Sequence, residues 1–315
     1  MPSDATPRLG IHLTNFATED RGDWSHLVDL AVAADRNGLD KVVVSDHVAM
    51  GEHLDEYGRP EVGGAKGGKQ PTGPDGLWLE PLTLLSVIAG RTEHVRLGTQ
   101  VLLAALRRPV VLAKTLATLD VLSGGRVDLG IGVGWQREEY DAAGLDFDTR
   151  GKLLDDTIGV LQTLWREQSA TFDVGGRTAS NIHQMPKPRQ ADGVPVWVSG
   201  TLNKRVAERL ASYGSGWIPW GDDAADLTAS IPRLWQMVRD AGGDPDRLRV
   251  IGNLAAVKND AGDADVRASV AAVPELRAAG VTDFLFRVPL PPDAEEAGAV
   301  FAEWSGAFRE VTGRA

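Results

Sequence analysis

The segment from residue 95 to residue 139 constrains the fold more than any other part of the chain. It holds an apolar run at 95–101, a helical stretch that Pro109 opens, and a second apolar run that ends in Gly134 and Trp135. This order predicts a strand, a helix and a second strand, with small or polar residues where each strand ends. Because parallel α/β folds bind ligands at the carboxyl ends of their strands, we expect functional residues at these points.

The alternation of strand and helix continues along the whole sequence. Short runs that are apolar on both faces predict eight buried parallel strands, at 9–13, 41–45, 95–101, 126–133, 195–199, 216–220, 248–256 and 283–288. Helical spacing of apolar residues predicts helices between them, at 24–37, at 80–91, from 109, from 154, at 204–213, at 224–241, at 265–279 and at 295–312. A (β/α)8 TIM barrel needs about 250 residues, so these 315 residues, which no linker divides, predict a single α/β barrel domain over 1–315. An open doubly wound sheet with a second domain is the alternative.

Two segments exceed a minimal barrel and predict insertion loops after strands 2 and 4. The first, 48–79, is rich in glycine, and the second, 169–193, lies between the fourth helix and the fifth strand. Long loops after strands lie on the ligand-binding face, so the first is either a mobile lid or a surface insertion. Its glycine run at 63–69 lacks the Lys-Ser/Thr ending of a phosphate-binding P-loop.

Composition narrows the class of protein. The net charge of −11 and the absence of a basic cluster argue against nucleic-acid binding. No apolar run reaches the roughly 20 residues that span a bilayer, and no secretory signal is visible, so we expect no membrane association and a cytoplasmic location. There is no cysteine, and no histidine pair has helical metal-ligand spacing, so we predict no metal.

The second predicted strand ends in Ser45, Asp46 and His47. At the mouth of a barrel a carboxylate can bind a donor on a planar ligand, and an imidazole can move protons near neutral pH. The alternative is a capping aspartate and a surface histidine. His12, inside the first strand, faces either the mouth or the core.

Three other sequence features argue mainly against particular functions. The glycines at 130, 132 and 134 lie inside a strand and have the wrong spacing for a dinucleotide-binding turn, so they indicate close approach of a backbone or a flat ligand. Ser199, Gly200 and Thr201, before a helix that starts near Asn203, suit either a phosphate site or an ordinary N-cap. No G-x-S-x-G elbow for acyl transfer occurs.

Together these strings resemble the luciferase-like monooxygenase superfamily, and most closely its coenzyme F420-dependent oxidoreductases. The resemblance covers the chain from Leu9 to about Trp220. It rests on the motifs Ser45-Asp46-His47-Val48, Val95-Arg96-Leu97-Gly98-Thr99, Ser123-Gly124-Gly125-Arg126, Gly132-Val133-Gly134-Trp135, Pro186-Lys187-Pro188 and Val196-Trp197-Val198-Ser199-Gly200.

The resemblance implies an oxidoreductase that moves a hydride between F420 and a small organic substrate at the carboxyl ends of the strands. It implies that His47 acts as acid or base and that Gln100-Val101 forms a non-proline cis peptide behind the ring. The cofactor contacts it implies are Asp46, Thr99, Gln100, Val101, Gly134, Ser199, Gly200, Thr201 and Trp220. It also implies a homodimer, the assembly common among the family's members.

One position departs from the family's pattern. Its sugar-phosphate dehydrogenases carry a carboxylate directly after the strand-four glycines, where this chain has Trp135. Glu138 is then the candidate catalytic carboxylate, while Trp135 and His12 become substrate-binding candidates. Trp135 predicts an apolar or aromatic substrate wall rather than a sugar-phosphate site. The alternatives are an FMN-dependent monooxygenase that uses a separate reductase and oxygen, and a barrel that binds a ligand without turnover.

Overall fold

The computed structural model describes residues 5–64 and 66–314. Its centre is a closed barrel of parallel strands in the order β1-β14-β11-β10-β9-β6-β5-β3. The barrel strands are β1 (Arg8–His12), β3 (Lys41–Val44), β5 (Arg96–Thr99), β6 (Val127–Ile131), β9 (Val196–Gly200), β10 (Gly216–Pro219), β11 (Arg249–Leu254) and β14 (Asp283–Phe286). Each coincides with one of the runs predicted from sequence, so the (β/α)8 barrel is confirmed.

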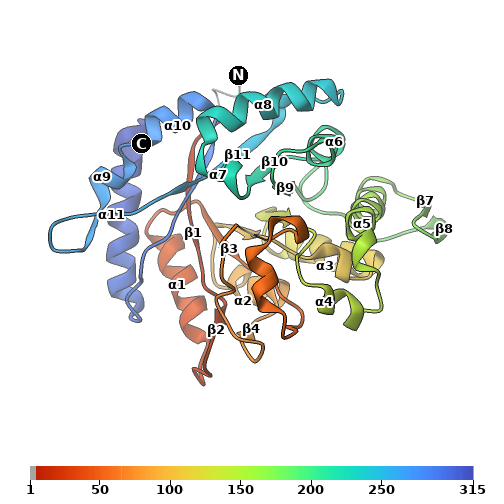
Figure 1. Ribbon diagram of the computed structural model, residues 1–315, viewed down its shortest axis with the longest axis horizontal. Coiled ribbons are helices and arrows are strands. Elements are labelled where there is room, and N and C mark those ends of the chain that lie inside the picture. Colours follow the sequence, from red (N-terminus) through yellow and green to blue (C-terminus); the bar gives the residue numbers. More distant parts are fainter. Residues whose placement is uncertain (1–4, 65, 315) are drawn as a thin grey trace.

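Helices surround the barrel on the outside (Figure 1). They are α1 (Ser25–Arg36), α2 (Pro81–Ala89), α3 (Pro109–Leu122), α4 (Arg137–Ala142), α5 (Arg150–Arg166), α6 (Lys204–Ser212), α7 (Asp222–Ala225), α8 (Leu227–Asp240), α9 (Val266–Val270), α10 (Val273–Ala279) and α11 (Ala294–Thr312). Two predicted helices are each divided in two. The side chain of Asp226 accepts a hydrogen bond from the amide of Ala229 and so starts α8 after α7. Pro274, in the first turn of α10, separates that helix from α9. Among the described residues, no helix is both long and apolar enough to cross a membrane.

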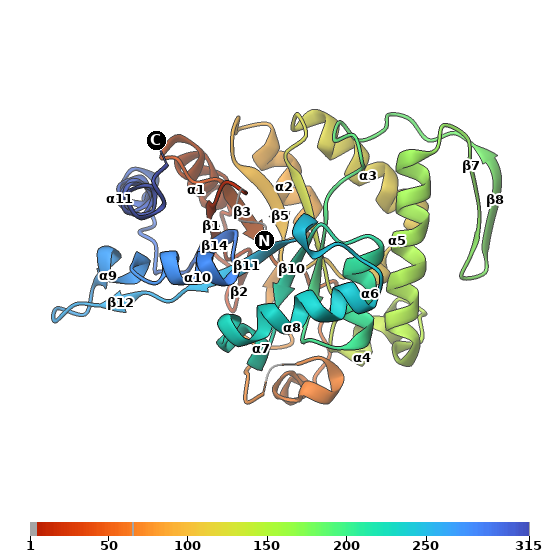
Figure 2. The ribbon, with the colours of Figure 1, turned by 90° about the horizontal axis from the view of Figure 1, so that it is seen from above.

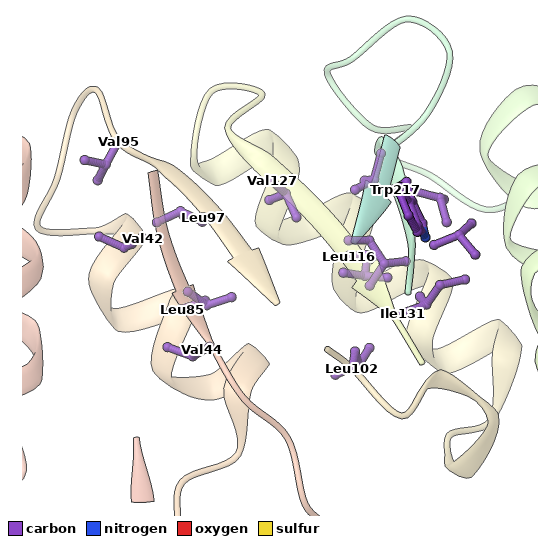
Figure 3. Packing of buried hydrophobic residues seen from close by; sticks show 14 of the residues in the cluster. Val42, Val44, Leu85, Val95, Leu97, Leu102, Leu116, Val127, Ile131 and Trp217 are labelled. Carbon is purple, nitrogen blue, oxygen red and sulfur yellow. The ribbon is translucent and has the colours of Figure 1, made fainter. Parts of the chain in front are cut away.

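The alternating side chains of the strands build two apolar layers. Val42 and Val44 of β3 and Leu97 of β5 face outward and pack in the same layer as Leu85 of α2 and Leu116 of α3 (Figure 3). Inward-facing residues of five strands fill the barrel axis as a second cluster, formed by Val43, Trp197, Ile218, Ile251 and Leu285. The barrel therefore has a packed interior, and a ligand must bind above it.

Charged residues close the amino-terminal end of the barrel. The buried ammonium of Lys41 lies 2.9 Å from Asp128 and 3.4 Å from Asp283, and 4.0 Å from the centre of the Trp197 ring. Arg96 and Arg249 complete the pairing of the two carboxylates. Burial opposes ionisation of both carboxyls, but the charges of Lys41 and the neighbouring arginines together outweigh it and lower the pKa of each.

The two surplus segments lie at different places. Residues 48–79 form the 3₁₀ turns η1 (Leu54–Gly58) and η2 (Pro60–Val62) and the strand β4 (Leu77–Trp78), which pairs with β2 (Phe16–Ala17). Figure 2 shows η1 and η2 in orange at the same end of the barrel as α4 and α7. Ala65, within the glycine run, lies outside the described residues.

The second surplus segment lies between the fourth predicted helix, α5, and the fifth predicted strand, β9, as the sequence indicated. It forms the hairpin β7 (Ala170–Val174) and β8 (Arg177–Ile182), which projects beyond α5 (Figure 2). Because it follows α5 and leads into β9, it returns to the amino-terminal end of the strands, where Gln190 bonds Asp120 and Arg96. A further hairpin, β12 (Val257–Lys258) and β13 (Ala264–Asp265), follows β11 and is not predicted by the sequence. The remaining 3₁₀ turns are η3 (Ala104–Leu106), η4 (Phe147–Thr149) and η5 (Pro245–Arg247).

Candidate active site

A layer of mostly polar residues lies at the carboxyl ends of the strands. It covers the apolar cluster inside the barrel formed by Val43, Trp197, Ile218, Ile251 and Leu285, which we call the apolar plug. A residue two positions beyond an inward-facing one points the same way, so Val43 leads to Ser45, Ile218 to Trp220 and Leu285 to Arg287. His12 of β1 joins this layer, since its Nε2 lies 2.8 Å from the hydroxyl of Ser45. The sequence did not decide whether His12 faces the mouth or the core of the barrel. In the structure it faces the mouth.

His47 lies beside this layer and is held by Glu139. Its Nδ1 is 3.1 Å from one carboxylate oxygen of Glu139, whose side chain is fully buried, while His47 itself is 11% exposed. The other oxygen accepts the amides of Val48 and Ala49, at 2.7 and 3.3 Å. Glu139 therefore fixes both the imidazole and the chain beyond it, and leaves Nε2 of His47 without a partner among the described residues.

Four aromatic rings line the space next to His47, and we call them the aromatic box: Tyr57, Trp78, Trp135 and Trp220. Trp78 and Trp135 meet the imidazole edge-on, with ring centres 4.7 and 5.9 Å away. Tyr57 contacts Trp135 and Trp220 in the same manner, at 5.4 and 6.4 Å. The apolar wall expected at Trp135 is thus part of a larger apolar surface. Trp220, which the resemblance implied as a cofactor contact, belongs to the same surface.

Tyr57 comes from residues 48–64, which we call the cap segment. The segment leaves β3, and β10 is the strand farthest from β3 around the barrel. Yet Trp220, directly after β10, donates a hydrogen bond from Nε1 to the carbonyl of Gly64 at 3.2 Å. Arg150 donates to the carbonyl of Val62 at 3.3 Å. The cap segment therefore crosses the mouth from one side to the other.

Asp46 is fully paired within the protein, and its predicted contact with the cofactor stays a prediction. Its side chain is fully buried, and both oxygens pair with Arg107, at 2.6 and 3.0 Å. One oxygen also accepts the amide of Leu103 at 2.9 Å. Because Ser45 points into the mouth, the next residue along the strand points away from it. Asp46 thus holds the chain after β5 in place, and Arg107, which also pairs with Glu80, is already neutralised.

Glu138 lies on the rim of the mouth. Its carboxylate pairs with Nδ1 of His53, an exposed residue of the cap segment. This bond raises the pKa of His53; burial opposes ionisation of Glu138, but the same bond leaves its pKa below the ordinary value. Gly51 packs against Glu138 with no room for a Cβ atom. Glu138 therefore fastens the cap segment to α4, and its catalytic role stays a prediction.

Several buried polar atoms around the mouth have no partner among the described residues. They are Nδ1 of His12, Oε1 of Gln100, Nε1 of Trp135, Oε1 of Gln136 and Oε2 of Glu138. Buried polar groups in folded proteins are almost always hydrogen-bonded, because leaving one unpaired costs about 1–3 kcal/mol. Their residues lie at or just after the carboxyl ends of β1, β5 and β6, so a ligand bound there would meet both donors and acceptors.

The predicted phosphate region is only partly open. Asn203 caps α6 through its side chain, and Asp223 accepts the amide of Leu202 at 2.6 Å. Ser199 and Gly200 are half-buried at the end of β9, while Thr201 is exposed. The ordinary N-cap is therefore present, and the part that remains for a phosphate is the Ser199–Thr201 turn.

Of the three glycines predicted inside a strand, Gly130 lies in β6, while Gly132 and Gly134 follow it. The protein itself explains all three. A Cβ atom on Gly130 would lie 2.0 Å from the carbonyl of Thr99, and one on Gly132 would lie 2.5 Å from the side chain of Val101. Gly134 has φ +71°, a conformation that side chains rarely adopt. These positions let the chain after β5 approach β6 closely, and the Gln100–Val101 peptide there is cis, as the resemblance implied.

Sequence reasoning missed three residues of the site. Glu139, rather than Glu138, holds His47, and only the rotation of α4 decides between two adjacent glutamates. Tyr57 lies in a segment without periodicity. Arg287 was detectable, since it directly follows the eighth predicted strand, where functional residues are expected.

With this geometry described, comparison with known proteins defines the family. A model described as luciferase-like monooxygenase matches residues 8–306. The chain therefore belongs to the luciferase-like monooxygenase family.

Individual relatives are distant. An uncharacterised protein of Mycobacterium tuberculosis is 28% identical, over 87% of this chain and 90% of its own. The F420-dependent glucose-6-phosphate dehydrogenase of Segniliparus rotundus is 30% identical, over 75% of this chain and 66% of its own. An F420-dependent secondary alcohol dehydrogenase, solved with an F420–acetone adduct, is similar in fold, with a TM-score of 0.73, 18% identity, and coverage of 96% and 99% of the two chains. The oxygenating constituent of 3,6-diketocamphane monooxygenase of Pseudomonas putida, solved with FMN, has a TM-score of 0.68 at 14% identity, over 96% and 98% of the two chains.

Proposed function

We propose that this protein is an F420-dependent oxidoreductase that transfers a hydride between the deazaflavin and a small organic substrate in the barrel mouth. The unpartnered polar atoms beneath the cap segment carry this proposal. A deazaflavin ring has both N–H and carbonyl groups on its edge, and so matches a set that contains the amide oxygen of Gln100 and the indole N–H of Trp135. The family membership and the two F420-dependent proteins above support the same cofactor.

The residues that would hold the cofactor follow from the site. Gln100, Val101 and Gly134 would contact the ring, and the Ser199–Thr201 turn would receive the phosphate of the tail. Bound there, F420 supplies a ring carbon that accepts or delivers the hydride, while the protein supplies orientation and proton transfer.

His47 is the proton-transfer residue in this proposal. Glu139 accepts a hydrogen bond from Nδ1–H, which leaves Nε2 as the atom that takes a proton from a substrate hydroxyl or returns one to a carbonyl. The aromatic box surrounds the imidazole and limits the access of water. A ligand-binding barrel without turnover has no need of such a pair.

A cofactor titration tests the proposal. We expect the purified protein to quench F420 fluorescence with a dissociation constant in the micromolar range and to ignore FMN. The structural likeness to an FMN-bound monooxygenase makes FMN the relevant competitor. Tight FMN binding with oxygen consumption in the presence of a reductase would replace the proposal by the monooxygenase alternative, and failure of both cofactors to bind would favour the non-catalytic barrel.

A further inference from the structure

Arg287, which directly follows β14, is a cation without a counter-ion among the described residues. The carboxylates described above are each matched, Asp46 by Arg107, Glu138 by His53 and Glu139 by His47. The guanidinium of Arg287 forms no ion pair or hydrogen bond within residues 5–64 and 66–314. Its side chain is exposed to solvent at the end of β14, so an anionic ligand can reach it.

The register of the barrel fixes where Arg287 lies. Ile11 of β1 pairs with Phe286 of β14, so the next residues along the two strands, His12 and Arg287, are neighbours. Leu285 belongs to the cluster inside the barrel, and Arg287, two residues on, therefore points into the mouth. It faces the space above the apolar plug rather than the outer helices.

The charge of Arg287 affects the pKa values of two neighbouring residues, His12 and Tyr57. The pKa of His12 falls to about 3, first because the ring is buried and then because Arg287 is nearby. Burial raises the pKa of Tyr57 in the cap segment, and Arg287 opposes that rise. The charge of Arg287 therefore acts both on the wall of the barrel and on the cap segment. The hydroxyl of Tyr57 is also without a partner among the described residues.

We propose that Arg287, with the hydroxyl of Tyr57, receives an anionic group of the substrate, so that the enzyme acts on a small organic acid whose apolar body contacts the aromatic box. A guanidinium and a phenol together offer charged and neutral donors to a carboxylate or a phosphate. Tyr57 also belongs to the aromatic box, whose Trp135 it contacts, so a donor for the anion and the apolar walls share one residue. This inference rests on the proposed function, since it takes the remaining space of the mouth as the substrate's.

The first arm of the test measures anion binding with and without cofactor. Benzoate and inorganic phosphate are titrated against wild-type protein and Arg287→Gln, with tryptophan fluorescence as the readout and neutral benzamide as the matched probe. We expect the substitution to weaken benzoate binding about tenfold or more and to leave benzamide unchanged. Arg247→Gln, an exposed arginine before β11 at the opposite end of the barrel, is the matched control and should bind benzoate as the wild type does. Equal benzoate affinities in wild type and Arg287→Gln would overturn the proposal.

The second arm separates the substrate's anion from the phosphate and carboxylates of the F420 tail. F420 and its chromophore without the tail are each titrated against both proteins. Unchanged affinity of Arg287→Gln for both compounds supports the substrate site, whereas a loss for F420 alone would assign Arg287 to the tail and overturn it. If wild-type protein binds neither compound, the proposed function fails. The benzoate titration without cofactor still shows whether Arg287 binds an anion.

Discussion

Glu139 holds His47 in place, and this arrangement predicts what the loss of the imidazole would do. We expect His47→Ala to retain cofactor affinity, because the imidazole is not among the residues that would contact the ring, and to slow hydride transfer by about 10²–10⁴-fold, the usual contribution of a general acid or base. Single-turnover absorbance of F420 measures the step. His94→Ala, at an exposed position before β5, serves as the control, and an unchanged rate in His47→Ala would remove the residue from the mechanism.

The two adjacent glutamates of α4 make a sharper comparison. Glu139→Gln keeps an oxygen for the amides of Val48 and Ala49 but turns an N–H toward Nδ1 of His47, which favours the wrong tautomer. We expect a rate loss of about 10²-fold or more. Glu138→Gln should lose less, because Glu138 pairs with His53 on the rim. The reverse order would return the catalytic role to Glu138.

These residues also show how far sequence reasoning extends. His47 could be predicted because it follows a strand at the ligand-binding end. The outward orientation of Asp46 follows from strand alternation, but the prediction weighed the motif more heavily than the alternation. Glu139 could not be chosen over Glu138, since neighbouring helical residues point about 100° apart and only tertiary contacts set the rotation of a helix this short.

At the scale of elements, the barrel strands were predictable and the cap segment was not. Buried parallel strands leave continuous apolar runs, a signal that survives without tertiary information. The cap segment is held instead by single contacts to distant parts of the chain, such as Trp220 to Gly64 and His53 to Glu138. No local pattern encodes such contacts, so its path across the mouth required the structure. The homodimer and the cytoplasmic location stay predictions.

The His53–Glu138 pair makes the cap segment sensitive to pH. The pair raises the pKa of His53, and Glu56 and Asp55 add to the effect. A raised pKa means that the stabilisation is fully present below the ordinary histidine value, about 6.5, and is lost as the pH rises through the raised value. We expect backbone amides of 52–64 to exchange with deuterium faster at pH 8.5 than at pH 6, after correction for intrinsic rates.

A pair of variants checks that this pH dependence arises from His53. His53→Ala should remove the difference between the two pH values, and His26→Ala, on the distant helix α1, should keep it. Equal corrected exchange at both pH values in the wild type would show that the pair does not fasten the segment.

For the molecule as a whole, stability and function are assigned to opposite ends of the barrel. The amino-terminal end is closed by Lys41, which is 2% exposed and neutralises Asp128 and Asp283. Removing one partner of a buried ion pair leaves an uncompensated charge and costs about 3–5 kcal/mol. Lys41→Met preserves the length of the side chain while removing its charge, so we expect urea unfolding to show a loss of that size.

The matched control is a pair whose lysine is exposed. Lys152 lies 2.6 Å from Asp156 on the surface of α5, and Lys152→Met should cost less than about 1 kcal/mol. The folded fraction of Lys41→Met should bind F420 with wild-type affinity, because the apolar plug separates the ion-pair network from the mouth. Weakened F420 binding would show that the two ends are coupled.

The pH dependence of stability tests the ion pairs of Lys41 with Asp128 and Asp283 independently. Because the pKa values of Asp128 and Asp283 are lowered in the folded protein, their stabilisation is present above the ordinary carboxyl value, about 4. It is lost as the pH falls through the lowered values. In Lys41→Met the same carboxylates lose the ammonium and keep only Arg96 and Arg249, so protonation removes less stabilisation than in the wild type. The stability difference between wild type and variant should therefore shrink as the pH falls below about 4, whereas a difference that stays constant down to the acid transition would trace the loss to packing instead of charge.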